Sequence, residues 1–340
     1  MANLKTTLPQ GSLVLVTSAT GYVASHVVKQ FLERGYRVRG TVRDLAKASW
    51  LTEGVFKPYA ETGYLSLTVV PDLGADHAFD DSVKGVSAIV HMATIASFDP
   101  DPNKVVPQTV AGITSLLNAA MKEPTVREFV YTGSIVTSTM VIPGLSTHVE
   151  HDTWNDLAVQ LAWAPPPYEP SRGFIVYMAS KVAAEKEFWA VTERQPHFTV
   201  NVISPATIFG PPLNQKHLVK KSAFVTALWN GDTDELSQIP ATYVIDVQDV
   251  ALLHVAAILD PDVRGGRLQA WGWPCNWNDI LAILREIRPD RKFVSDFPNS
   301  QQLSLTTDHG PALALLKKWC QQDGWRSLKH TIADSLIGLE

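Results

Sequence analysis

The feature that most constrains the fold is a short buried strand near the amino end, followed by a small-residue turn and a helix. Leu13 to Thr17 form a largely apolar run, as parallel strands covered on both faces do. Tyr22 to Arg34 then shows helical periodicity, and Gly35 is placed to end that helix. This order predicts a strand-turn-helix unit at the start of a parallel sheet.

The same alternation continues to residue 204. Further strands are expected at 36–42, 65–70, 87–93, 128–132 and 199–204, with long helices at 105–121 and 177–193. Alternating strands and helices predict an α/β fold, a Rossmann-type doubly wound parallel sheet. After Pro205 the chain is less regular and richer in tryptophan, which predicts a smaller C-terminal lobe over the carboxyl edge of the sheet.

The turn at residues 17–24 has the character of a dinucleotide-binding loop. In such loops one glycine makes the tight turn, a second admits the pyrophosphate, and a third position, Gly or Ala, packs the helix on the sheet. Gly21 and Ala24 fill the second and third roles, but Ser18 stands where the first glycine belongs. Its Cβ would crowd the turn, or its hydroxyl would bond a phosphate oxygen. The expected cofactor contacts here are Thr17, Ser18, Thr20, Gly21, Tyr22 and Val23.

The end of the second expected strand bears on which dinucleotide is bound. An acidic residue there would bind the ribose 2′-hydroxyl of NAD, whereas a guanidinium matches the 2′-phosphate of NADP in charge and fork geometry. Arg43 occupies this position, so we expect NADP (NADPH). Asp44 is a competing acidic candidate, and Arg39 is expected to be a solvated residue at the strand edge.

Tyr177 and Lys181 are four residues apart, about one helical turn, so both side chains can lie on one face. A phenol is a weak acid near neutrality, and a nearby ammonium favours its phenolate form. The pair therefore suits reversible proton transfer to a carbonyl oxygen. In isolation the same spacing is more often a structural tyrosine beside a solvated lysine; the dinucleotide loop upstream and Ser134 at the end of a strand favour catalysis.

Composition argues against several other functions. The net charge is −5 and lysine/arginine clusters do not exceed pairs, so nucleic-acid binding is not indicated. The two cysteines form no CxxC, and the histidines form neither HxxxH nor HExxH, so no metal is expected. No apolar run approaches a membrane span and the amino end has no apolar leader, so we expect a cytoplasmic protein without membrane association.

Together these motifs resemble the extended (atypical) short-chain dehydrogenase/reductase family, in its dihydroflavonol-reductase-like subgroup. Within that subgroup the likeness is greatest to fungal NADPH-dependent aldehyde/ketone (carbonyl) reductases, and it covers essentially the whole chain. The segments that carry the resemblance, in family order, are 17–24, Arg43, Asp72-Leu73, His91-Met-Ala, Tyr131-Thr-Gly-Ser134, Tyr177–Lys181 and 204–211.

The resemblance implies residue roles by position. Tyr177 would give its proton to the substrate oxygen, and Lys181 would lower the pKa of Tyr177 and hold the nicotinamide ribose. Ser134 would polarise the carbonyl; the residue before it is Gly133, where many relatives have Ser or Thr. Classical relatives have an asparagine in a proton relay, but this chain has Ser115 near the equivalent place. We therefore assign no relay residue. The further cofactor contacts expected are Asp72 and Leu73 near the adenine, Met92, Ala93 and Thr94 beside the ribose and nicotinamide, and Pro205, Ala206, Thr207 and Ile208 around the carboxamide.

The expected substrate pocket is mostly apolar, which suits aryl or alkyl ketones, aldehydes and keto esters. Its expected residues are Ile95, Phe98, Ile135, Phe174, Phe209, Ala241, Thr242 and Tyr243. We expect residues 1–204 to form the NADP-binding Rossmann domain, with a return segment near 243–260, and residues 205–340 to form mainly the substrate-binding lobe.

The expected function is an NADPH-dependent carbonyl reductase that acts on a small-molecule carbonyl compound, as a monomer or homodimer. Two alternatives stay open on the sequence alone. One is a nucleotide-sugar epimerase or dehydratase, which shares the Tyr/Lys pair. The other is a non-catalytic NADP-binding scaffold on the same fold.

Overall fold

Seven parallel strands form the central sheet of the structure, a computed structural model that describes residues 4–95, 97–194, 196–218, 224–234, 236, 241–298 and 301–339. The strand order is β10-β7-β5-β4-β1-β2-β3, and every pairing is parallel. The strands are β1 (Leu13–Val16), β2 (Arg37–Val42), β3 (Leu65–Val69), β4 (Ala88–His91), β5 (Glu128–Thr132), β7 (Thr199–Pro205) and β10 (Arg267–Ala270).

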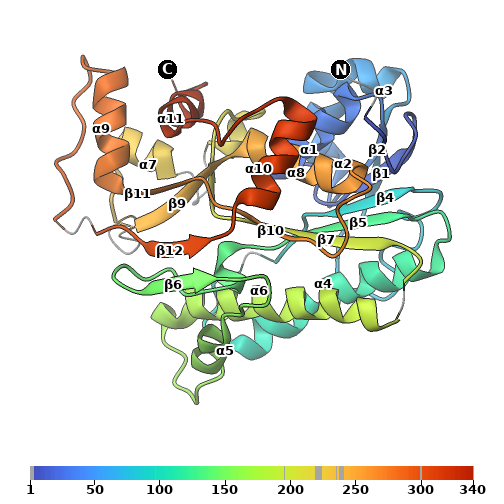
Figure 1. Ribbon diagram of the computed structural model, residues 1–340, viewed down its shortest axis with the longest axis horizontal. Coiled ribbons are helices and arrows are strands. Elements are labelled where there is room, and N and C mark those ends of the chain that lie inside the picture. Colours follow the sequence, from blue (N-terminus) through green and yellow to red (C-terminus); the bar gives the residue numbers. More distant parts are fainter. Residues whose placement is uncertain are drawn as a thin grey trace.

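Helices cover both faces of this sheet, as Figure 1 shows. Successive side chains of a strand point to opposite faces. Val14 and Val16 therefore lie in one core, with α1 (Tyr22–Glu33), α8 (Val247–Leu259) and α10 (Gly310–Cys320), whereas Leu15 lies in the other. That second core is formed with α4 (Pro102–Lys122) and α6 (Gly173–Ala190). The predicted Rossmann-type doubly wound fold is confirmed.

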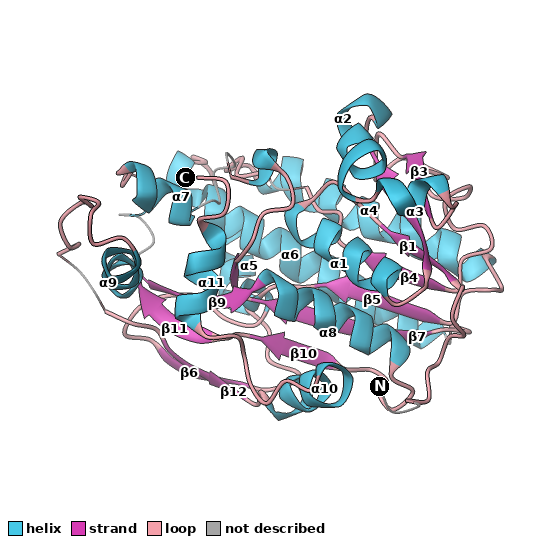
Figure 2. Cartoon of the chain, turned by 90° about the horizontal axis from the view of Figure 1, so that it is seen from above, coloured by secondary structure: helices cyan, strands magenta, loops and turns pink. Residues whose placement is uncertain are grey.

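The lobe contains a second sheet in which β9 (Ala241–Asp246) lies between β8 (Thr207–Phe209) and β11 (Trp273–Asn276). Residues of α7 (Phe224–Asn230), α9 (Trp277–Ile287) and α11 (Leu328–Ser335) form a separate core with it. Figure 2 shows these elements together at one end of the molecule. A two-stranded sheet joins β6 (Ser146–Val149) to β12 (Ser304–Thr307). The other helices are α2 (Leu45–Ser49), α3 (Lys57–Glu61) and α5 (Asp156–Ala162).

The chain returns from the lobe to the central sheet by a longer path than the expected segment 243–260. β9 belongs to the lobe sheet, while α8, β10 and α10 pack with the central sheet. The helix expected to begin at Tyr177 begins at Gly173, so Tyr177 lies in its second turn. Gly173 admits this start because a Cβ there would lie 2.2 Å from the carbonyl oxygen of Phe98. Within the described residues, no helix combines the length and hydropathy that a membrane span requires.

Candidate active site

A cavity of about 1000 Å³ lies between the central sheet and the lobe. Its floor comes from residues that follow β1, β4, β5 and β7, including Gly21, Met92, Ser134 and Ala206. Its other walls come from β8, α7 and β9 of the lobe. Ligands of doubly wound sheets bind at this carboxyl edge, so the cavity is the candidate active site.

The turn after β1 holds Ser18 in a conformation that favours glycine. Its φ is +53°, in the left-handed region that costs an L-residue with a Cβ about 1–2 kcal/mol. Two hydrogen bonds stabilise the turn: the Ser18 amide donates to Thr41 Oγ1 at 3.0 Å, and the Gly21 amide donates to the Ser18 carbonyl at 2.7 Å. Ser18 therefore adopts the backbone of the missing first glycine, and its side chain lines the cavity.

The amino end of α1 opens onto the same cavity. Gly21 is its N-cap, and among the described residues no side chain caps it and no acidic residue lies in its first turn. Tyr22, Val23 and Ala24 line the cavity. Uncapped N–H groups and the positive end of the helix dipole suit a pyrophosphate. The Tyr22 hydroxyl donates to the Gly210 carbonyl at 2.7 Å and so joins α1 to the lobe.

Two residues of this turn lie away from the cavity. The Thr17 hydroxyl is fully buried and accepts hydrogen bonds from the Met92 and Ala93 amides, both at 2.9 Å. Thr17 therefore holds the segment after β4, and its side chain does not face the cavity. The Thr20 carbonyl accepts from His217 Nε2 at 3.2 Å, which ties the turn to the lobe.

The basic and acidic candidates at the end of β2 differ in whether other residues of the chain already bind their side chains. Arg43 is exposed and makes no hydrogen bond or ion pair with any described residue, so its guanidinium is available to a ligand. The Asp44 carboxylate caps α2 by accepting from the Lys47 amide at 3.2 Å. Arg39, expected to be solvated, instead donates to the carbonyls of Ser82 and Lys84, both at 2.8 Å.

The remaining cofactor candidates fall into two groups. Met92, Thr94, Ala206, Thr207 and Ile208 line the cavity. The described residues that line it do not include Ala93, Pro205, Asp72 or Leu73. Asp72 accepts from the Gly74 amide at 2.9 Å in an exposed turn, and Leu73 packs on the core beside α4.

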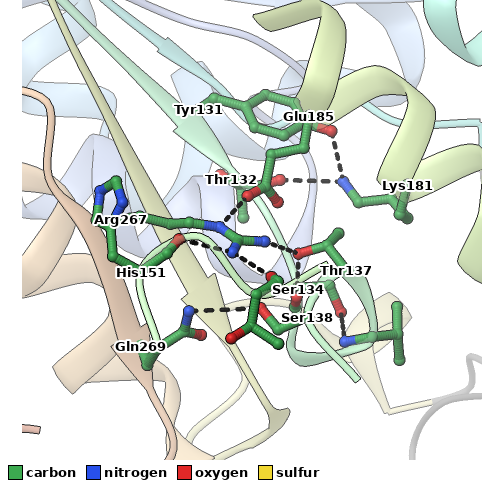
Figure 3. A network of polar contacts seen from close by, with 12 residues as sticks. Tyr131, Thr132, Ser134, Thr137, Ser138, His151, Lys181, Glu185, Arg267 and Gln269 are labelled. Atoms are coloured by element: carbon green, nitrogen blue, oxygen red, sulfur yellow. Dashed lines mark hydrogen bonds and ion pairs between the residues drawn. The ribbon is translucent and has the colours of Figure 1, made fainter. Parts of the chain in front are cut away.

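Ser134 and Tyr177 both line the cavity, from the segment after β5 and from α6. Lys181 lies behind them, fully enclosed, and its ammonium donates to the Tyr131 hydroxyl at 2.9 Å and to the Thr132 carbonyl at 3.0 Å, as Figure 3 shows. An ammonium has three N–H donors, so one is left for a ligand. Tyr131 was missed by sequence reasoning, although strand alternation from Phe129 places it on the face toward α6.

Burial controls protonation in this part of the site. It lowers the pKa of Lys181 to about 8, and the Glu185 carboxylate one turn along α6 opposes that shift. It also raises the pKa of Tyr177. This burial opposes the lowering of the Tyr177 pKa that was expected from Lys181, whose ammonium is directed at Tyr131 and Thr132. His91 is buried and neutral, with its pKa lowered to about 3.

An aromatic wall, defined here as Phe98 and Phe174, flanks the Tyr177 ring. Ring centroids lie 5.4 Å apart for Phe98 and Tyr177 and 6.1 Å apart for Phe174 and Tyr177. Both phenylalanines are exposed, at 56% and 38%, because they stand at the mouth of the cavity. Offset or tilted ring contacts of this kind are favourable for aromatic guests.

Most expected substrate-pocket residues do line the cavity: Phe98, Ile135, Phe174, Phe209, Ala241 and Thr242. Ile95 and Tyr243 are not among its described lining residues. The Tyr243 hydroxyl donates to the Leu305 carbonyl at 2.5 Å, and its ring packs beside Trp271, so it braces β9 against β12. Lining residues that the sequence did not reveal include Val141, Phe224 and Thr226, on a loop and a lobe helix whose path in space no local pattern encodes.

Comparison with known proteins agrees with this geometry. A model described as the NAD dependent epimerase/dehydratase family matches residues 14–267. Aldehyde reductase 2 of Sporidiobolus salmonicolor is 35% identical over 340 aligned residues, which cover 98% of this chain and 97% of that protein. Ketoreductase adrE of Penicillium rubens is 35% identical over 331 residues, which cover 96% of each chain.

A solved structure shares the whole architecture. Yeast methylglyoxal/isovaleraldehyde reductase Gre2, complexed with NADPH, has a TM-score of 0.77 and 26% sequence identity, covering 96% of this chain and 97% of that chain. The family match runs from β1 to the start of β10 and includes the described lining residues of the cavity apart from Ser335. The chain therefore belongs to the NAD dependent epimerase/dehydratase family, within the extended short-chain dehydrogenase/reductases.

Proposed function

We propose that the protein is an NADPH-dependent carbonyl reductase that converts aldehydes and ketones to alcohols. One observation carries this proposal: Ser134 and Tyr177 line the same cavity as the glycine turn after β1, with the Lys181 ammonium directly behind them. A nucleotide-holding fold does not need a hydroxyl pair beside a buried ammonium. Reductases among the relatives and an NADPH-complexed reductase of the same fold support it.

The residues fit a reduced dinucleotide phosphate. Glycine at position 21 permits the tight turn, because a Cβ there would lie 3.1 Å from the Ser18 carbonyl oxygen. The uncapped amino end of α1 would receive the pyrophosphate, and Arg43 would bind the 2′-phosphate. Lys181 would hold the nicotinamide ribose with its third donor, and Ala206 to Ile208 would frame the carboxamide. NADPH supplies the hydride when it is bound.

The chain's own groups would handle the proton and the carbonyl oxygen. Ser134 would donate a hydrogen bond to that oxygen and polarise the carbonyl. Because burial raises the pKa of Tyr177, its phenol stays protonated near neutrality and can give its proton to the oxygen as negative charge develops there. The Lys181 ammonium, through Tyr131 and Thr132, would stabilise the phenolate that remains.

The substrate class follows from the walls. The cavity is lined mainly by apolar side chains, among them Phe98, Ile135, Val141, Phe174 and Phe224. Such a lining favours aryl ketones, aldehydes and keto esters over charged sugars. Among the described lining residues there is no lysine or arginine to clamp a nucleotide diphosphate, which weighs against a nucleotide-sugar epimerase or dehydratase.

Assembly and compartment belong to the same proposal. We infer a cytoplasmic enzyme, because both cysteines are free: Cys275 is buried and Cys320 half-buried. The proposal includes a monomer or a homodimer as the assembly.

The decisive experiment is an initial-rate panel with NADPH and NADH against a dozen carbonyl compounds, plus a nucleotide sugar. We expect consumption of NADPH with aryl ketones and keto esters, and formation of the matching alcohol by chromatography. Turnover of the nucleotide sugar without net NADPH consumption would instead establish an epimerase or dehydratase. Tight NADPH binding with no turnover of any compound would leave the scaffold function.

A further inference from the structure

A buried ion pair lies beneath the candidate catalytic residues. Glu185 on α6 and Arg267 on β10 meet with Oε1 and Nε 2.6 Å apart, and their side chains are 0% and 1% exposed. Removing two charges from water costs several kcal/mol per ion, and a well-packed apolar pair is often as stable. The pair is therefore a poor device for stability alone, and its contacts indicate what else it does.

Glu185 acts on the lysine. It lies one helical turn after Lys181, and its negative charge raises the lysine pKa, against the burial that lowers it to about 8. The other titratable groups around Lys181 are Tyr131 on β5, His91 on β4 and, one turn earlier on α6, Tyr177. His91 is neutral and the pKa values of both tyrosines are raised, so Glu185 is the anion among these described neighbours.

Arg267 acts on the serine segment. Its guanidinium donates to Thr137 Oγ1 at 3.3 Å and to the carbonyls of His151 and Thr153 at 2.9 and 2.6 Å. The Thr137 hydroxyl in turn donates to the Ser134 carbonyl at 2.7 Å. Figure 3 shows the guanidinium between Glu185 and this segment. The edge strand of the sheet is thereby tied to the main chain that presents Ser134.

The second carboxylate oxygen explains a departure in the sequence. Glu185 Oε2 has no hydrogen-bond partner among the described residues and faces the backbone of Gly133, where a Cβ would lie 2.6 Å from it. Ser204 Oγ would lie 2.7 Å from the same Cβ. A Ser or Thr at position 133 would displace Glu185, so glycine there and the buried carboxylate go together.

We propose that Glu185 and Arg267 are positioning residues of the proton-transfer site, Glu185 as the counter-charge of Lys181 and Arg267 as the anchor of Ser134 through Thr137. This rests on the proposed reductase function. The two arms predict different signatures: loss of the counter-charge changes the pH profile, and loss of the anchor changes turnover alone.

Glu185→Gln tests the first arm. Activity that needs the Lys181 ammonium is lost as pH rises through the lysine pKa, and removal of the anion lowers that pKa. We expect the descending limb of kcat/KM to move by about one pH unit to lower pH. NADPH binding, followed by tryptophan fluorescence against pH, should weaken over the same shifted range. An unmoved limb in folded Glu185→Gln would overturn this arm.

A double variant separates positioning from folding. Glu185→Gln alone leaves a buried guanidinium uncompensated, so it can unfold the chain. Glu185→Gln with Arg267→Met removes both charges, and we expect its melting temperature to recover towards that of the parent while the pH limb stays displaced. Recovery of the parent pH profile together with stability would show a purely structural role.

Thr137→Val tests the second arm without changing any charge. We expect kcat to fall about tenfold, less than the loss of about 10²–10³ when an oxyanion donor is removed outright, because Thr137 acts only through the Ser134 main chain. NADPH affinity and the pH profile should stay unchanged, and Thr137→Ser should restore kcat. Thr139→Val is the matched control, because the Thr139 hydroxyl bonds the Met140 carbonyl in the same loop. A kcat of Thr137→Val equal to that of the parent would contradict the role of Arg267 as the anchor of Ser134. If the parent reduces no carbonyl compound, the proposed function fails instead, and the NADPH-binding profile still decides the Glu185 arm.

Discussion

The floor and the mouth of the cavity are built in different ways. Behind the floor, Lys181 of α6 is buried and donates to Tyr131 of β5, and the buried Glu185 of α6 accepts from Arg267 of β10. At the mouth, Phe98 and Phe174 are exposed and touch Tyr177 only through ring contacts. A reacting group needs to be held within a fraction of an ångström, whereas an apolar wall tolerates the substitution of one apolar side chain by another. The difference assigns chemistry to the floor and substrate choice to the mouth.

Among the variants proposed here, Tyr177→Phe should reduce kcat the most. The substitution removes the proton donor and keeps the ring that packs against the aromatic wall. We expect kcat for ketone reduction to fall about 10³-fold, within the range for loss of a general acid, while NADPH affinity stays near that of the parent. The measurements are steady-state rates and a fluorescence titration with NADPH.

The matched control is Tyr64→Phe, which removes a hydroxyl from an exposed tyrosine beyond α3. It should leave both kcat and affinity unchanged. Equal rates for Tyr177→Phe and the parent would remove Tyr177 from the mechanism. The floor would then serve only to bind ligands, as the mouth does.

Arg43→Ala tests a third region, the end of β2, which lies outside the described cavity lining and where we propose that the 2′-phosphate binds. Loss of a charge-assisted contact to the 2′-phosphate costs about 2 kcal/mol, so KM for NADPH should rise about 30-fold. KM for NADH, which lacks that phosphate, should change little. Arg37→Ala, at the start of the same strand, is the control. An unchanged ratio of the two KM values would show that Arg43 does not read the phosphate.

Substitutions in the aromatic wall should have smaller effects and a different form. Phe98→Ala or Phe174→Ala removes a ring contact worth about 1 kcal/mol, so KM for an aryl ketone should rise about fivefold. KM for a small aliphatic aldehyde and kcat for both substrates should stay close to the parent values. A fall in kcat that is equal for both substrates would contradict the assignment of substrate choice to the mouth.

The same contrast explains what the sequence could predict. The strands were predictable because short runs rich in β-branched and aromatic residues favour buried strands; β5, for example, spans Glu128–Thr132 as expected. Tyr177, Lys181 and Ser134 were found because helical spacing and strand ends are local features. Their membership of one cavity followed from the sheet topology.

What the sequence could not predict depends on contacts between distant segments. Thr17 was expected to meet the cofactor, but its hydroxyl bonds the amides after β4, and Tyr243 bonds Leu305 on another sheet. Arg267 carried no signal, since its partner Glu185 lies in a different element and the spacing from Lys181 to Glu185 alone predicts only a helix face. Local patterns show where groups stand along the chain, whereas side-chain partners depend on how the elements assemble.

Ser18→Gly should give the smallest effect and sharpen the coenzyme end of the comparison. Relief of a left-handed φ gains about 1–2 kcal/mol, and the greater freedom of glycine in the unfolded chain costs about 0.5–1 kcal/mol. We expect the free energy of unfolding to rise by about 0.5 kcal/mol, seen as a rise of roughly 1–2 °C in melting temperature. Ser18→Ala, which keeps the Cβ but removes the hydroxyl, should show no such gain.

NADPH affinity then separates the two roles of the Ser18 side chain. A hydroxyl that bonds phosphate predicts weaker binding in both variants, and a Cβ that crowds the turn predicts tighter binding in Ser18→Gly alone. A melting temperature below that of the parent in Ser18→Gly would contradict the strain assigned to this turn.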